Sequence, residues 1–239
     1  AAQNQASKWG RRSNDASYGC NPCSEILLRD KQFCNLTEVV VRADDTYITL
    51  KRKVQLATIL GTIQSTLTNF GFLSEEWVKN TEEERLLGVS LTGIMDNKLT
   101  NGSDIYSDEP FGLGTLASML ESLRDHTRET NEKWADMLGI PSSTAITCVK
   151  PSGTVSQLVN SASGIHARHN PYYIRRIRMD KKDPMYQFLK DKGLDVEDDV
   201  RVPDTTAVFS FPMKAPEGAI CRTDRTALEQ LELWLIYQR

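Results

Sequence analysis

The residues best suited to chemistry lie between positions 20 and 34, where three of the five cysteines are concentrated. We predict an extended segment from Cys20 to Glu25, in which Pro22 fixes one dihedral angle and restricts the residue before it. In an extended chain alternate residues share a face, so Asn21, Cys23 and Glu25 would lie roughly 6–7 Å apart. An amide, a thiol and a carboxylate on one face could address a sugar ring through its hydroxyls and carbon atoms. The same pattern is also typical of an ordinary surface loop.

A second thiol, Cys34, lies at the start of a predicted strand and offers a reductant for a two-electron step. Two other interpretations concern Cys20-x-x-Cys23, as half of a zinc site or as a thioredoxin-like dithiol. Zinc requires a second ligand pair at matching spacing, and neither Cys148 and Cys221 nor the three histidines supply one. A thioredoxin-like pair belongs at a strand-to-helix junction, which the polar flanks do not indicate. We therefore expect no metal site, and we interpret Cys148 and Cys221 as small buried apolar residues.

A turn of small residues follows Lys150, between a predicted strand and a predicted short helix. Backbone N–H groups and hydroxyls at the start of a helix can hold a phosphate. Simple capping of the helix by Ser152 or Thr154 explains the same pattern without any ligand. The sequence leaves both interpretations open. The candidate phosphate-binding residues are Pro151, Ser152, Gly153, Thr154 and Val155.

Four arginines lie within eleven residues between Arg168 and Arg178, interleaved with aromatic side chains. They could meet a phosphate or a nucleotide, or they could equally be the solvated positions of one strand. We interpret the nearby His166 and His169 as structural or capping residues rather than metal ligands.

Apolar periodicity and turn residues predict strands that alternate with helices, which is typical of parallel βαβ units covered by helices. The fold class is therefore α/β, and periodicity does not decide between an open sheet and a barrel. Leu56, Ile59, Leu60, Ile63 and Leu67 are predicted to form the core-facing side of the first long helix. Strands are expected at 35–41, 86–92, 145–149, 172–179 and 207–211, and helices at 56–70, 113–138, 154–160, 184–190 and from about 223.

Composition excludes several classes of protein. A net charge of -3 argues against general nucleic-acid binding, which needs a basic excess. No apolar run approaches membrane-spanning length, and the first ten residues lack a hydrophobic signal core. Five cysteines are too few for a disulfide scaffold. We expect a soluble, cytoplasmic protein.

Taken together, the motifs resemble those of the ribonucleotide reductases. The matching motifs occur in the expected order through most of residues 15–180. Their sequences are most similar to those of the adenosylcobalamin-dependent class II enzymes, especially the monomeric branch that reduces ribonucleoside triphosphates. The motifs are Asn-Pro-Cys-x-Glu, Phe-Cys-Asn-Leu-Thr-Glu, Arg-Leu-Leu-Gly-Val-Ser-Leu-Thr-Gly, Pro-Ser-Gly-Thr-Val-Ser and His-Ala-Arg-His-x-Pro-Tyr-Tyr-Ile-Arg-Arg.

The resemblance implies a portion of a ten-stranded α/β barrel, with a central finger loop carrying the radical cysteine. Cys23 matches that cysteine, which becomes a thiyl radical through adenosylcobalamin and abstracts the ribose 3′ hydrogen. Glu25 matches the base for the 3′-hydroxyl proton, and Asn21 matches a residue that hydrogen-bonds the substrate hydroxyls. Cys34 matches one of two thiols that reduce the sugar as the 2′-hydroxyl leaves as water. The turn from Pro151 to Val155 matches the one that holds the substrate phosphates.

The departures from the family pattern are also informative. The strand that supplies the partner of Cys34 and the C-terminal cysteine pair that re-reduces the site find no match here. We expect residues 1–239 to be one catalytic-core segment, incomplete at both ends and inactive alone: a split subunit, an expressed fragment or a partial sequence. The implied partners are a ribonucleotide substrate, a deoxynucleotide effector bound outside this segment, a thioredoxin-type reductant and a complementary chain.

Two alternatives stay open. The first is the large-subunit core of a class I reductase, in which a partner protein supplies the radical. The second is a non-catalytic nucleotide-binding module of the same fold. The sequence leaves four properties undetermined: the choice between di- and triphosphate substrates, the effector specificity, the oligomeric state and the thiol partner of Cys34.

Overall fold

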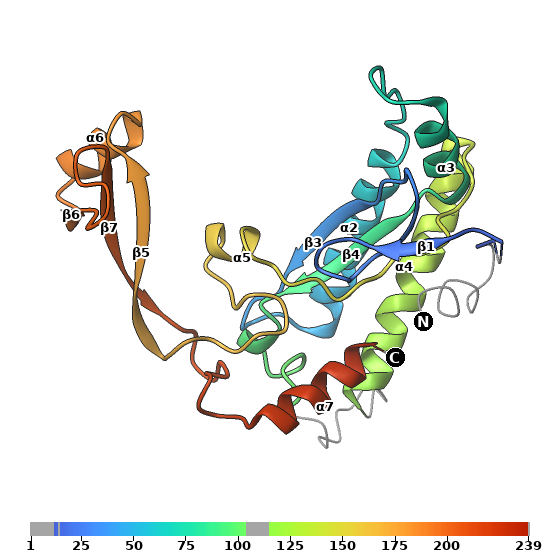
Figure 1. The fold of residues 1–239 in the computed structure, drawn as a ribbon. Helices are drawn as coiled ribbons and strands as arrows, with labels where there is room; N and C mark the ends of the chain where they lie inside the picture. The colour runs from blue at the N-terminus through green and yellow to red at the C-terminus, as the bar shows by residue number, and fades with distance from the viewer. Residues whose placement is uncertain (1–11, 14, 104–114, 239) are drawn as a thin grey trace.

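The computed structural model describes residues 12–13, 15–103 and 115–238 (Figure 1). The chain is α/β, as predicted, with a body built around parallel strands and an arm of antiparallel strands. The strands are β1 (Tyr18–Cys20), β2 (Leu27–Arg29), β3 (Asn35–Val40), β4 (Leu87–Thr92), β5 (Tyr172–Asp180), β6 (Val196–Asp198) and β7 (Thr206–Lys214). The helices are α2 (Tyr47–Gln64), α3 (Glu75–Glu84), the 3-10 turn η1 (Ile94–Asp96), α4 (Leu116–Leu138), α5 (Val155–Leu158), α6 (Pro184–Asp191) and α7 (Ala227–Gln238).

The central sheet of the body pairs β3 with β4 in parallel, from Asn35 opposite Leu87 to Val40 opposite Thr92. The predicted strand at 145–149 forms only an isolated parallel bridge, between Thr147 and Val89. Its backbone nevertheless bonds to β4, since Val89 N donates to Ile146 O at 2.7 Å and Cys148 N donates to Val89 O at 3.0 Å. β4 is therefore flanked on both sides and is almost wholly buried, which explains its continuous run of small and apolar residues.

Helix α2 covers one face of this sheet and packs against α4. A capping box between Thr46 and Thr49 fixes its start. The prediction of its core-facing side was wrong, because Leu56 is 50% exposed and Leu60 is 60% exposed. The buried side carries Leu50, Val54, Thr58, Gly61 and Thr62 instead. The helix also ends at Gln64, before the predicted Leu67 and Phe70.

Helix α4 confirms the predicted long helix as far as it is described; positions 113 and 114 of that prediction lie outside the described residues. Thr115 caps its start, and Gly139 ends it in the left-handed conformation with φ 65°. Leu116 and Leu123 are buried, whereas Met137 is exposed.

The arm consists of β5, β7 and β6 in that order, with α6 against them, and it extends away from the body (Figure 1). Both pairings are antiparallel, with Tyr172 opposite Lys214 and Val196 opposite Phe209. The expectation of parallel units throughout was therefore wrong for this half of the chain. β5 and β6 both run antiparallel to β7 and therefore parallel to each other, with α6 as the crossover between them, but β7 lies between the two and makes both pairings antiparallel.

A buried ion pair holds the base of the arm to the body. Arg168 donates through Nε to Asp96 Oδ1 and through Nη2 to Asp96 Oδ2, both at 2.8 Å. The Ala162 N–H donates to the same carboxylate at 2.8 Å, and the Asn160 amide oxygen accepts from Arg168 Nη1. Segment 160–168 is thereby fixed along the carboxyl end of β4. Within the described residues, no helix combines the length and apolarity needed to span a bilayer.

Candidate active site

The segment that carries Asn21, Cys23 and Glu25 is the tip of a hairpin, not an extended strand. Strands β1 and β2 pair in antiparallel fashion, from Tyr18 opposite Arg29 to Cys20 opposite Leu27. The tip closes through a turn, in which Ser24 N donates to Asn21 O at 2.9 Å. The side chain of Asn21 also closes it, because Asn21 Oδ1 accepts from Ile26 N at 3.0 Å. The predicted shared face of Asn21, Cys23 and Glu25 is therefore wrong, since the chain reverses between them.

The hairpin tip presents Cys23 as an exposed free thiol. Ser24 follows it in the left-handed region, with φ 63°, and turns the chain back toward the sheet. Cys20 is also exposed, and its sulfur lies 3.6 Å from Ser24 Oγ. Among the residues that the structure describes, no group of three or more His, Cys, Asp or Glu side chains is placed to hold a metal ion.

A buried carboxylate anchors the stem of the hairpin. Glu84, at the end of α3, is 1% exposed and accepts hydrogen bonds from Arg12, Arg29 and Gln32. Burial raises its pKa, but the bonds from Arg12 and Gln32 outweigh burial and hold the pKa of Glu84 below its ordinary value. Three donor side chains that converge on one buried carboxylate restrain the position of the strands that carry them. The hairpin therefore has a rigid base.

The hairpin tip also contacts the face of the sheet opposite α2. Gly88 of β4 lies opposite Leu36, and a Cβ on Gly88 would stand 3.2 Å from Ile26 Cδ1 and 3.3 Å from Cys148 Sγ. Because side chains alternate along a strand, Cys34 shares this face with Leu36. We call this side, with the hairpin tip over it, the inner face of the sheet.

Glu25 and Cys34 interact electrostatically on the inner face. Burial raises the pKa of the Cys34 thiol to about 12, and the Glu25 carboxylate acts in the same direction while Arg12 opposes it. Cys34 is therefore a protonated thiol at neutral pH. One carboxylate oxygen, Glu25 Oε2, is buried without a hydrogen-bond partner among the described residues. A carboxylate that lacks a donor inside a protein is costly unless a ligand or water supplies one.

A third thiol, Cys148, belongs to the same site. Burial raises its pKa to about 12, and Cys34 and Glu25 contribute in that order, while Lys150 lowers it. Cys148 is only partly buried, so the expectation of a buried residue holds for it in part, and its neighbours show that it lines the inner face. The sequence signal that could have found it is its place at the carboxyl end of a predicted strand, directly before the candidate phosphate turn. Cys221 is buried, as predicted.

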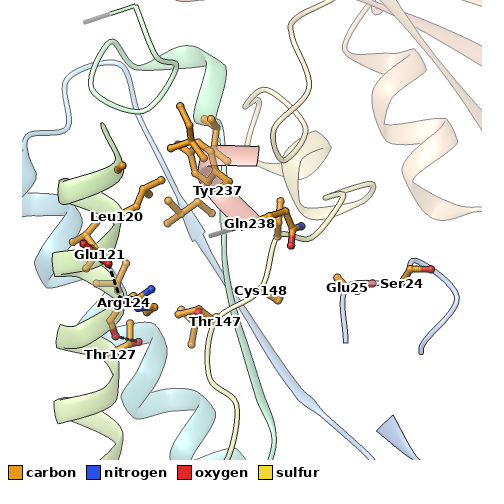
Figure 2. Close-up of a pocket in the computed structure, with 18 residues that line it drawn as sticks. Ser24, Glu25, Leu120, Glu121, Arg124, Thr127, Thr147, Cys148, Tyr237 and Gln238 are labelled. Atoms are coloured by element: carbon orange, nitrogen blue, oxygen red, sulfur yellow. Dashed lines mark hydrogen bonds and ion pairs between the residues drawn. The ribbon is translucent and has the colours of Figure 1, made fainter. Parts of the chain in front are cut away.

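A cavity of about 430 Å³ opens beside Cys148 at the free edge of the sheet. Figure 2 shows Ser24 and Glu25 of the hairpin tip on one side of it and α4, with Leu120 and Arg124, on the other. Tyr237 and Gln238 of α7 close one end. Its walls are largely apolar, with Glu25 and Cys148 among the few polar groups on the hairpin side. Such a mixed lining is typical of small-molecule sites.

The turn after Lys150 contains the cap that the sequence suggested at Ser152 and leaves the phosphate-binding interpretation open. Ser152 is buried and caps α5, since its Oγ accepts from Ser156 N at 3.1 Å. Thr154 makes no such capping bond. Within the described part of the chain, the N–H groups of Gly153, Thr154 and Val155 meet no acceptor. Three consecutive free donors can bind an anion.

The back of this turn is packed too tightly for a side chain. Gly164, with φ 55°, lies against it, and a Cβ there would stand 2.6 Å from Lys150 O. The hydroxyl of Ser163 donates to Ser152 O, on the same side. The turn is therefore supported from behind, and its free N–H groups are presented at the surface.

In the described structure, the arginines of the segment 168–178 bind other residues of the protein. Arg168 is buried against Asp96, Arg178 donates to Asp199 at 2.6 Å, and Arg175 donates to Gln157 O at 2.8 Å. His166 contacts Ser163 O through Nδ1 at 3.0 Å, in line with the structural role expected for it. These contacts favour the structural interpretation of the segment over a nucleotide-binding one.

The sequence is similar to curated ribonucleotide reductases over most of its length. It is 31% identical over 224 residues to the adenosylcobalamin-dependent ribonucleoside-triphosphate reductase of Euglena gracilis, covering 92% of this chain and 28% of that protein. It is 31% identical over 218 residues to the enzyme of the same name from Lactobacillus acidophilus, covering 84% of this chain and 29% of that protein. The chain thus spans less than a third of the length of these relatives. No family model matches the sequence.

The fold gives a concordant result. The chain superposes on the crystal structure of a B12-dependent (class II) ribonucleotide reductase with a TM-score of 0.74 and 26% sequence identity. The match covers 96% of this chain and 34% of the solved one.

Proposed function

We propose that this chain, which is related in sequence and fold to a segment of the class II ribonucleotide reductases, supplies the catalytic face of such an enzyme. The enzyme would reduce ribonucleotides, as triphosphates, to 2′-deoxyribonucleotides. The observation that carries the proposal is the Glu25 carboxylate beside the protonated thiol of Cys34, directly under a hairpin tip with a free cysteine.

In the proposed reaction the Cys23 thiyl radical takes the hydrogen atom from C3′ of the ribose. Glu25 accepts the proton of the 3′-hydroxyl, and its unpartnered Oε2 gives it the capacity to do so. The role of Asn21 is narrower than the family pattern implies, because its Oδ1 is used to close the hairpin tip. Its Nδ2 is left to donate to a substrate hydroxyl.

Cys34 supplies the proton and half of the electron pair for loss of the 2′-hydroxyl. The C2′–O bond breaks and the hydroxyl leaves as water with a proton from the thiol. Two thiols become one disulfide as the sugar gains two electrons, and the proton of the second thiol ends in the new C2′–H bond. Cys23 then returns the hydrogen atom to C3′, and Glu25 returns the proton to the 3′-hydroxyl. A pKa of about 12 suits this role, because a thiol that must deliver a proton has to retain it at neutral pH. We assign the second thiol to a residue outside this chain.

Adenosylcobalamin, when bound, would supply the radical that oxidises the Cys23 thiol. The exposure of Cys23 fits this requirement, since a buried thiol could not be reached by a large cofactor. A corrin brings its own metal ligands, so the chain needs no cluster of ligating side chains. The residues of this chain keep the thiol fixed at the tip through the Glu84 anchor.

The turn from Pro151 to Val155 would bind the substrate phosphates through its free N–H groups, with Lys150 adding positive charge nearby. We further propose that the body is part of a ten-stranded barrel with the hairpin as its finger loop. The full enzyme would need the remaining strands, an effector site, a thioredoxin-type reductant and a reducing cytoplasmic environment.

The test is exchange of tritium from the adenosyl 5′ carbon of adenosylcobalamin, measured in the complete enzyme that contains this chain. Wild-type enzyme should exchange, Cys23→Ser should not, and Cys20→Ser should exchange normally because Cys20 lies outside the reaction. Absence of exchange in wild-type enzyme that still forms deoxynucleotides would favour a class I radical source. Deoxynucleotide formation by the Cys23→Ser enzyme would overturn the proposal in favour of a binding module.

A further inference from the structure

Glu38 is an acidic residue on the inner face that none of the proposed steps uses. It lies four residues after Cys34 on β3, and strand alternation places both on the same face. It pairs with Ser90 of β4, while Val89 bridges to Thr147 on the next strand. Glu38, Ser90 and Cys148 therefore form one row across the sheet.

One oxygen of this carboxylate has no donor. Glu38 Oε1 is buried and meets no hydrogen-bond partner among the described residues. Glu25 Oε2 is the second carboxylate oxygen of the inner face in this condition. A buried acceptor that stays unpaired costs roughly 1–3 kcal/mol, and more when it is charged, so we expect a donor to be present in the working protein.

The surroundings of Glu38 restrict the nature of this donor. Its charge acts on the Cys148 thiol together with those of Glu25 and Lys150, so each of these groups lies near Cys148. The neighbouring positions on β4 are Gly88 and Ser90; Leu36 and Ile26 fill the space over Gly88, so a ligand would reach Glu38 beside the small side chain of Ser90. A phosphate offers only acceptors and negative charge, and a carboxylate repels it. A neutral hydroxyl or amino group is favoured.

We propose that Glu38 is a positioning residue that accepts a hydrogen bond from the nucleoside part of the bound nucleotide. The inference rests on the proposed function and extends it to a residue on the sheet. With the phosphates at the turn after Lys150 and the ribose under the hairpin tip, a nucleotide would cross the row of side chains that includes Glu38. Corrin amides are a second source of neutral donors, and the experiment separates the two.

The experiment measures equilibrium binding of CTP, inorganic tripolyphosphate and adenosylcobalamin separately to the complete enzyme. Glu38→Ala should weaken CTP binding about tenfold, the effect of losing one hydrogen bond to a charged group. Glu38→Gln keeps an acceptor oxygen and should lose less. Tripolyphosphate should bind the variant as well as wild type or better, and adenosylcobalamin should bind unchanged. Glu132→Ala, at an exposed position on α4, is the control.

Unchanged CTP binding by Glu38→Ala would overturn the inference, as would an equal loss with tripolyphosphate or a loss confined to adenosylcobalamin. If Glu38→Ala does not fold, Glu38→Asp retains the charge, withdraws the oxygen and should weaken CTP binding. These outcomes differ from failure of the proposed function, in which wild-type enzyme itself would lack tritium exchange or bind no CTP.

Discussion

Ile26 extends over Gly88, so that a residue at the end of the hairpin tip occupies the space where β4 lacks a side chain. A Cβ on Gly88 would stand 3.2 Å from Ile26 Cδ1 and only 2.4 Å from Leu36 Cδ2. Ile26 is 7% exposed, so this contact is part of the packed interior. The glycine therefore determines how close the hairpin tip lies to the sheet.

Gly88→Ala should displace the hairpin tip and lower the free energy of unfolding by about 1–3 kcal/mol, as overpacking does in a dense interior. Urea unfolding measures the loss. Gly19→Ala is the matched control on the hairpin itself, since a Cβ there meets nothing within 4 Å. Equal effects of the two substitutions would contradict the packing of Ile26 against Gly88.

Cys34 should resist alkylation at pH 8, because burial and Glu25 raise its pKa to about 12. Glu25→Gln removes a negative charge that opposes the thiolate, so the pKa of Cys34 should fall while burial keeps it above the ordinary value. Mass spectrometry of iodoacetamide labelling as a function of pH measures both. Exposed Cys20 serves as the internal control for reagent access. Rapid labelling of Cys34 at pH 8 would show that it is not held as a thiol.

The same two buried thiols predict how stability depends on alkaline pH. The pKa of Cys34 and of Cys148 is raised in the folded state from 9.0 to about 12, so the folded protein holds these protons more tightly than the unfolded one. Their contribution is complete below pH 9 and is lost as the pH rises toward 12. Unfolding by urea at several pH values should show this decline, and Cys34→Ala with Cys148→Ala should flatten it.

Glu84→Gln should lower the free energy of unfolding by about 3 kcal/mol, because Arg12 would lose its buried carboxylate partner. The lowered pKa of Glu84 also means that its contribution is present above its ordinary pKa of 4.5 and is lost as the pH falls through the folded value. Glu83→Gln is the control, since Glu83 is half exposed and bonds to Arg29 alone; its loss should cost under about 1 kcal/mol. Thermal unfolding of the two variants compares them.

Asp96→Asn should lower the free energy of unfolding by about 3–5 kcal/mol, since it leaves the buried guanidinium of Arg168 without a counter-charge. Asp125→Asn, on the exposed side of α4, removes two surface pairs, with Arg124 and Arg128, and should cost under about 1 kcal/mol. Denaturant midpoints of the two variants give the comparison. A small effect at Asp96 would mean that the hydrogen bonds of Asn160 alone hold the base of the arm.

Periodicity predicted the existence of α2 but selected the wrong side of it. The buried side is lined by Thr58, Gly61 and Thr62, which look polar in sequence. Thr58 Oγ1 donates to Val54 O at 2.7 Å and Thr62 Oγ1 donates to Thr58 O at 2.8 Å, so these hydroxyls are satisfied within their own helix. Small side chains whose hydroxyls bond within their own helix allow the helix to pack closely against the sheet. A prediction based on hydrophobicity alone counts these residues as polar and misses the buried side.

The sequence predicted which residues belong to the candidate site better than it predicted how they are arranged. The pairing of β1 with β2 depends on only three residues in each strand, too few for an alternating pattern to appear. The Asn21 amide could bond to the substrate or to the backbone of the hairpin tip, and only the folded structure shows that its oxygen bonds to the backbone. The place of Cys148 on the inner face depends on which strands are neighbours, and a single sequence does not encode strand order locally. Antiparallel pairing in the arm escaped prediction for the same reason.

The hairpin has consequences for the spacing of residues along the chain. Six residues, 21–26, separate the last paired residue of β1 from the first of β2. Arg29 is bound to Glu84 at one end, and Ile26 is seated against Gly88 at the other, so neither end can slide to absorb a change in length. One inserted residue would have to be absorbed within the turn itself, where it would disturb the bonds that Asn21 accepts from Ser24 and Ile26 and would displace Cys23. Insertions should therefore be tolerated in the connection between α2 and α3, at 65–74, yet abolish function here even when every catalytic side chain is retained.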